Sequence, residues 1–144
     1  MSYSRPIVAV IEADATDRRL LCSLLSRLDA EVQDFDSAES FLAASIAKPK
    51  ENHGSESHGG ENHSSCLITD MTLPGMSGLE LLKRLRANRA ALPVILLGED
   101  ADVRAAVAAM RAGAVDYFEK THMDVSIVRR VAYLLDQSQQ RAAH

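Results

Sequence analysis

Short continuous apolar runs alternate along the chain with longer segments in which apolar residues recur every three or four positions. A continuous apolar run of this length is typical of a strand covered on both faces, as in a parallel sheet. The strands predicted on this basis are IVAVIE (7–12), a short strand at 31–35, CLITD (66–70), PVILLG (93–98) and VDYFEK (115–120).

A segment with helical spacing follows each predicted strand. The predicted helices begin after Asp14, near Asp36 or Ser37, at Leu79, at Asp102 and at Asp124. The second is expected to reach about residue 47, and Gly113 is a typical C-terminal stop for the fourth. Five consecutive strand–helix units predict an α/β fold, with one open, doubly wound sheet of five parallel strands and helices on both faces.

Polar residues stand where the first, third and fifth predicted strands end or just beyond, and a glycine ends the fourth. In such sheets, ligands bind beyond the carboxyl ends of the strands. Glu12 and Asp14 lie at the end of the first strand, Asp70 ends the third, Gly98 the fourth and Lys120 the fifth. We therefore expect three acids and one lysine to gather at one edge of the sheet.

The chemistry of this set is that of phosphoryl transfer. Carboxylates brought together repel one another, and a hard divalent cation such as Mg²⁺ relieves the repulsion through oxygen ligands. A lysine opposite them would hold phosphoryl oxygens, and Asp70 could act as the nucleophile and form an acyl phosphate. Taken alone, Asp70 would be better explained as a turn or cap residue before Pro74 and Gly75.

The composition indicates the class of protein and its cellular location. The 144 residues suit one domain with a sizeable core, and 47% apolar with 25% charged residues is ordinary for a globular protein. The formal charge of −4 is mildly acidic and so implies no general affinity for nucleic acid or anionic membranes. No apolar run approaches the ~20 residues of a membrane span. Cys22 and Cys66 form no disulfide framework and are expected in or beside the core, which favours a cytoplasmic location.

Two longer stretches resemble the receiver domain of two-component response regulators. They are ITDMTLPGMSGLELLKRLR and PVILL followed by DVRAAVAAMRAGAVDYFEK, and the resemblance covers nearly the whole chain. It implies the flavodoxin-like strand order 2-1-3-4-5 and Asp70 as phosphoacceptor. It further implies Lys120 as the phosphate contact, Tyr117 as the aromatic switch residue and the Thr72 carbonyl as a ligand of Mg²⁺. A sensor histidine kinase or phosphotransfer protein would then be the partner.

Three positions depart from the family pattern. Ala13 stands where the family carries an acid that touches the metal, so Glu12 or Asp14 would have to replace it. Gly98 stands where the family supplies a Ser or Thr hydroxyl, which removes the usual link to Tyr117. Thr121 replaces the proline that usually follows the lysine. These changes predict either slower phosphorylation at a weakened metal site or a degenerate receiver that switches by another route.

The expected domain spans residues 1–140, with residues 141–144 as a tail or the start of a linker. A polar insertion at about 48–65 carries His53, His58 and His63 at even spacing. A Zn²⁺ or Ni²⁺ site there is conceivable, but a solvated insertion is the better explanation, because a flexible chain offers no preformed geometry.

The favoured function is a phosphoacceptor that relays its signal through the face of the last two helices and the fifth strand. That face would contact an output domain or protein, or a second copy of the chain. Such a domain is not an enzyme beyond its own phosphorylation and dephosphorylation, and it does not bind nucleic acid directly. The alternative is a constitutive dimerisation or docking module. A phosphatase with an aspartyl nucleophile is weaker, because the second acid of those enzymes is Thr72 here.

Overall fold

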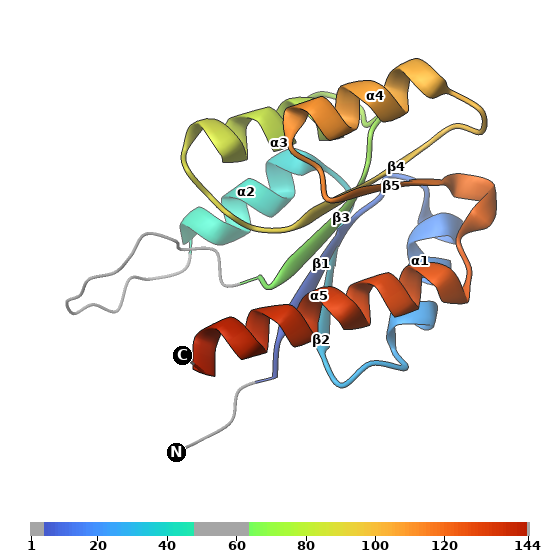
Figure 1. The fold of residues 1–144 in the computed structure, drawn as a ribbon. Helices are drawn as coiled ribbons and strands as arrows, with labels where there is room; N and C mark the ends of the chain where they lie inside the picture. The colour runs from blue at the N-terminus through green and yellow to red at the C-terminus, as the bar shows by residue number, and fades with distance from the viewer. Residues whose placement is uncertain (1–4, 48–63, 144) are drawn as a thin grey trace.

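Five parallel strands form one sheet in the order β2-β1-β3-β4-β5 (Figure 1). The computed structural model describes residues 5–47 and 64–143. The strands are β1 (Ile7–Ile11), β2 (Glu31–Phe35), β3 (Cys66–Asp70), β4 (Val94–Gly98) and β5 (Asp116–Glu119). The predicted fold class and strand order are confirmed.

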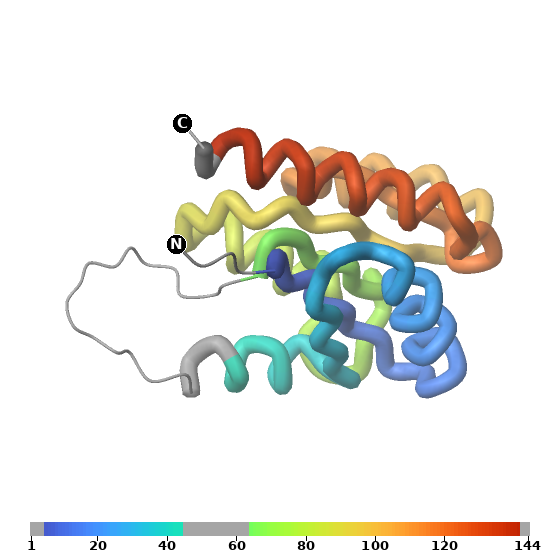
Figure 2. The backbone as a smooth tube through the Cα atoms, turned by 90° about the horizontal axis from the view of Figure 1, so that it is seen from below, coloured from blue at the N-terminus to red at the C-terminus, as the bar shows by residue number. Residues whose placement is uncertain are grey.

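Helices cover both faces of this sheet. They are α1 (Ala15–Leu25), α2 (Ala38–Ala47), α3 (Gly78–Ala87), α4 (Val103–Ala112) and α5 (Val125–Ala143). Helices α2, α3 and α4 lie on one side of the sheet, and α1 and α5 lie on the other (Figure 1). Figure 2 shows the same backbone seen from below. The doubly wound architecture therefore follows from the alternating sequence pattern.

The central strands are apolar on both faces because each face meets its own core. Alternate residues of β1 point to opposite sides, so Val8 and Val10 pack with α1 and α5 while Ala9 and Ile11 pack with the other three helices. All five residues of β3 and of β4 are buried. This two-sided burial is why those strands read as continuous apolar runs rather than alternating ones.

Local sequence signals set the helix ends. Asp14 caps α1 and Asp102 caps α4 by accepting a hydrogen bond from a first-turn amide, and the Ser37 hydroxyl accepts one from the Ser40 amide. Gly113 ends α4 with φ of 106°, a left-handed conformation that favours glycine. The predicted strand 115–120 is one residue too long at each end, since β5 covers Asp116–Glu119.

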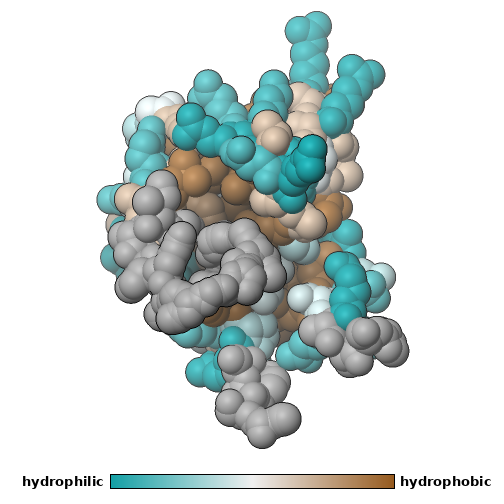
Figure 3. Space-filling model, turned by 90° about the vertical axis from the view of Figure 1, so that its left-hand side faces the viewer, coloured by the Kyte–Doolittle hydropathy of each residue, from teal (hydrophilic) through white to brown (hydrophobic). Residues whose placement is uncertain are grey.

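Lys120 instead opens a short 3₁₀ turn, η1 (Lys120–His122). This turn follows β5 at the carboxyl edge of the sheet, where the strands β1, β3 and β4 also end. Figure 3 shows the opposite end of the molecule, where polar side chains border apolar ones. Residues 48–63, which hold most of the predicted insertion and its three histidines, lie outside the described residues.

Candidate functional site

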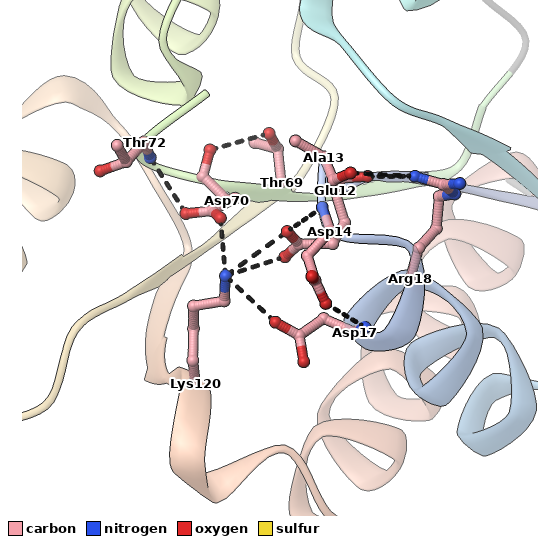
Figure 4. Close-up of polar contacts among 9 residues, drawn as sticks. All are labelled: Glu12, Ala13, Asp14, Asp17, Arg18, Thr69, Asp70, Thr72 and Lys120. Carbon is pink, nitrogen blue, oxygen red and sulfur yellow. Dashed lines mark hydrogen bonds and ion pairs between the residues drawn. The ribbon is translucent and has the colours of Figure 1, made fainter. Parts of the chain in front are cut away.

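The shortest ion pair at the carboxyl edge of the sheet joins Asp70 to Lys120 (Figure 4). Asp70 is the last residue of β3 and is only 6% exposed, and its Oδ2 lies 2.8 Å from the Lys120 Nζ. Its other oxygen, Oδ1, accepts a hydrogen bond of 3.0 Å from the Thr72 amide. Both carboxylate oxygens are thus held in place, and the sequence prediction that these residues meet is correct.

The backbone around Asp70 is packed tightly against the start of α3. The Thr69 hydroxyl donates to the Asp70 carbonyl, and the Gly78 amide donates to the Met71 carbonyl. A Cβ at Gly78 would overlap the Asp70 carbonyl oxygen, so this close approach requires glycine. Helix α3 therefore fixes the strand end that presents the carboxylate.

Glu12 brings a second carboxylate, which is almost completely buried. It follows β1 and is 1% exposed, and its Oε2 accepts hydrogen bonds from the Asp14 amide at 3.1 Å and from Lys120 at 3.4 Å. Its Oε1 lies 3.3 Å from the Lys120 Nζ but accepts no hydrogen bond from the described part of the chain. Burial raises the pKa of Glu12, the Asp14 amide opposes that shift, and the charge of Asp70 adds to it.

Lys120 is the cation between these carboxylates. Burial disfavours its ammonium, but the hydrogen bond and charge of Asp70, followed by those of Glu12, outweigh burial and raise its pKa above the usual value. Lys120 also reaches a residue that the sequence prediction missed, Asp17, whose Oδ2 lies 3.4 Å from Nζ. The sequence feature that could have indicated this contact is the position of Asp17 in the first turn of the helix after the first strand.

Asp14 caps the helix that the sequence predicts to begin after it. Its carboxylate accepts the Asp17 amide at 2.9 Å as the cap of α1, and the residue is exposed (Figure 4). Its role as a metal ligand stays a prediction, and this cap competes with it. Thr72 contacts Asp70 through its amide, and the ligand role of its carbonyl likewise stays a prediction.

Gly98 and Tyr117 are in direct contact across β4 and β5. A Cβ at Gly98 would overlap the hydroxyl oxygen of Tyr117 and crowd its ring. The hydroxyl donates to the Glu99 carbonyl at 3.3 Å. Burial raises the pKa of this phenol, and the negative charges of acids near the ring, Asp102 foremost, add to the shift. The two predicted switch residues are therefore together, with the tyrosine turned towards the sheet edge.

A second group of polar residues lies beside this pair. Asp100, Glu119 and His122 place their ligand atoms within 4.8 Å of one another. The three are half-buried or exposed and are already bonded: His122 pairs with Glu119 at 3.0 Å, and the Thr121 hydroxyl donates to Asp100. The oxygens of Glu12, Asp17 and Asp70 are not all this close, because the Lys120 ammonium lies between them.

The family model described as response regulator receiver domain matches residues 8–132. The chain belongs to the response regulator receiver family. Within the described residues, the receiver domain has no helix long and apolar enough to cross a membrane.

Named relatives agree with this assignment. The receiver domain is 36% identical over 131 residues to the transcriptional regulatory protein FixJ of Azorhizobium caulinodans, covering 91% of this chain and 56% of FixJ. It is 30% identical over 141 residues to the DNA-binding transcriptional regulator NtrC of Salmonella typhimurium, covering 95% of this chain and 27% of NtrC. A crystal structure of FixJ-N matches with a TM-score of 0.73 at 30% identity, covering 92% of this chain and 94% of that one. The receiver domain thus spans about half the length of its FixJ relatives.

Proposed function

We propose that this receiver domain accepts a phosphoryl group on Asp70 from the phosphohistidine of a sensor kinase or phosphotransfer protein. The observation that carries the proposal is the Asp70 carboxylate itself. It is nearly buried at a strand end, and it is held by the Lys120 ammonium on one oxygen and by the Thr72 amide on the other. A solvated turn or cap residue would need neither contact.

The proposed transfer makes one bond and breaks one. A carboxylate oxygen of Asp70 attacks the phosphorus atom, and a P–O bond forms as the P–N bond to the donor imidazole breaks. The electron pair of that bond stays on the imidazole nitrogen, and Asp70 carries an acyl phosphate. Lys120 remains opposite as a positive charge for the phosphoryl oxygens. The domain takes part as phosphoacceptor, and we propose no turnover of another substrate.

The residues present fit Mg²⁺. The available ligand atoms are all oxygens, and the buried Glu12 Oε1 accepts no hydrogen bond from residues 5–47 and 64–143 that a metal ion would have to replace. Glu12, Asp70 and the Thr72 carbonyl would hold the ion, while Asp14 stays on its cap of α1. When bound, Mg²⁺ supplies positive charge that offsets the carboxylates and the incoming phosphoryl group.

The output face is proposed to be formed by α4, β5 and α5. Val103, Val107 and Met110 follow one another along α4 and are 71%, 42% and 49% exposed, and Tyr133 on α5 is 53% exposed. Such apolar exposure suits contact with a second copy of the domain or with an output domain or protein. Because the relatives extend well beyond this chain, the proposal includes an output module in the full protein. It also includes a cytoplasmic location.

One observation favours a second function, a docking module that needs no phosphorylation. Tyr117 is already turned towards Gly98, and position 98 has no side chain with which to contact a phosphoryl group. In this alternative, the α4–β5–α5 face is permanently in its partner-binding form, and Asp70 only stabilises the fold.

Intact-mass spectrometry with acetyl phosphate and Mg²⁺ distinguishes the two. The phosphoacceptor predicts a phosphoryl adduct on the wild type, none on Asp70→Asn, and the wild-type amount on Asp136→Asn, a control that removes an exposed carboxylate from α5. Absence of an adduct from the wild type, with acetyl phosphate and with a phosphorylated histidine donor, would favour the docking module.

A further inference from the structure

The pocket around Lys120 holds more negative than positive charge. One ammonium faces three carboxylates, at 2.8 Å from Asp70, 3.3 Å from Glu12 and 3.4 Å from Asp17. Arg18 is another cation on the first turns of α1. Its guanidinium is directed to the backbone carbonyl of Glu12 at 2.7 Å and to Asp34 at 3.3 Å, and so does not contact the three carboxylates.

Asp17 is directed into this pocket by the start of α1. Its amide is held by the Asp14 carboxylate, so the first turn is locked and the Asp17 side chain projects towards Lys120 (Figure 4). The Asp17 side chain is 33% exposed and contacts Lys120, whereas Asp14 is exposed and faces the Asp17 amide. The same cap that removes Asp14 from the pocket thus places Asp17 beside it.

A second observation points to a cation-binding role for this pocket. The Oε1 atom of Glu12 is buried and accepts no hydrogen bond from any residue that the structure describes. This is costly for a carboxylate oxygen unless a positive charge lies against it. Lys120 is 3.3 Å away, but this ammonium is shared among all three acids. A divalent cation would satisfy the free oxygen and the excess charge together.

We infer that Asp17 is the third carboxylate of the divalent-cation site, acting with Glu12 and Asp70 in the place left by Ala13. The acid is supplied from the first turn of the helix instead of from the strand end. This inference rests on the proposed function, because it assumes that the Asp70 pocket binds Mg²⁺. A simpler role for Asp17 would be to stabilise the amino end of α1 through the helix dipole.

Binding of Mn²⁺ to the metal-free protein, followed by electron paramagnetic resonance and by competition with Mg²⁺, separates these roles. We expect Asp17→Asn to weaken binding by about tenfold or more, as loss of a group that supports a metal site does. Asp17→Glu keeps the charge and should retain most of the affinity. Asp14→Asn is the matched control, since it removes a charge from the same turn, keeps a good cap, and should weaken binding by no more than about twofold.

The rise in melting temperature on adding Mg²⁺ gives a second readout, because a ligand that binds only the native state stabilises it. This rise should be reduced in Asp17→Asn and kept in Asp14→Asn, while circular dichroism shows both variants folded. If Asp70→Asn loses Mn²⁺ binding but Asp17→Asn and Asp14→Asn behave alike, the inference is wrong and the proposed function stands. If the wild type shows no saturable binding at this pocket, the inference and the Mg²⁺-dependent function are both overturned.

Discussion

The hydroxyl of Tyr117 lies in the space that any side chain at position 98 would occupy, so Gly98 and Tyr117 are sterically matched across neighbouring strands. The contact explains why a glycine at the end of a buried strand is tolerated: the tyrosine ring fills the volume that a Ser or Thr would take.

We predict that Gly98→Thr destabilises the domain by about 1–3 kcal/mol, because the added atoms overlap the Tyr117 hydroxyl and force the ring to move. Urea unfolding measures the change. In the double variant Gly98→Thr with Tyr117→Ala, most of the added penalty should disappear, since the clashing partner is gone. Pairing Gly98→Thr with Tyr133→Ala is the control, because Tyr133 is exposed on α5. Equal penalties in both backgrounds would contradict the steric match.

We predict that Glu12→Gln changes the stability of the domain and its affinity for metal in opposite directions at neutral pH. Burial raises the pKa of Glu12 above 4.5, so the native state holds this proton more tightly than the unfolded state does. Its contribution to stability is therefore fullest below pH 4.5 and is lost as the pH rises through the native pKa. Without divalent ions, we expect the melting temperature of Glu12→Gln relative to wild type to increase between pH 4 and pH 7.

The same variant should bind Mn²⁺ about tenfold or more weakly, because the amide carries no charge. The control is Glu31→Gln, at an exposed position on β2. A Glu12→Gln protein that is less stable than wild type at pH 7 would show that attraction to Lys120 outweighs the burial of the carboxylate.

Thiol reactivity should follow the burial of the two cysteines. Cys66 is buried, and burial raises the pKa of its thiol to about 12, whereas Cys22 is half-buried. In a Cys22→Ser protein at pH 8, labelling of Cys66 by a disulfide reagent should be at least about a hundredfold slower than in urea, because little thiolate forms. In Cys66→Ser, Cys22 should label in the native state. Rapid native labelling of Cys66 would contradict its placement in the core.

The local sequence determined the elements of this protein. Continuous apolar runs become buried strands because both sheet faces are covered. Asp14 and Ser37 begin helices, and Gly113 ends one, through interactions within a few residues. The strand ends then bring Glu12, Asp70 and Lys120 to one edge, because parallel strands all present their carboxyl ends there. For these three residues, the sequence was sufficient to predict that they lie at the same edge of the sheet.

Only the tertiary structure decided how side chains at that edge are used. Asp14 and Asp17 are three residues apart, and the sequence favoured Asp14; the first turn of α1 makes Asp14 the cap and directs Asp17 to Lys120. The contact of Tyr117 with Gly98 depends on strand register and ring orientation, which no local pattern specifies. Apolar periodicity reports which face of an element is buried, whereas the direction of a polar side chain depends on partners that are distant in the chain.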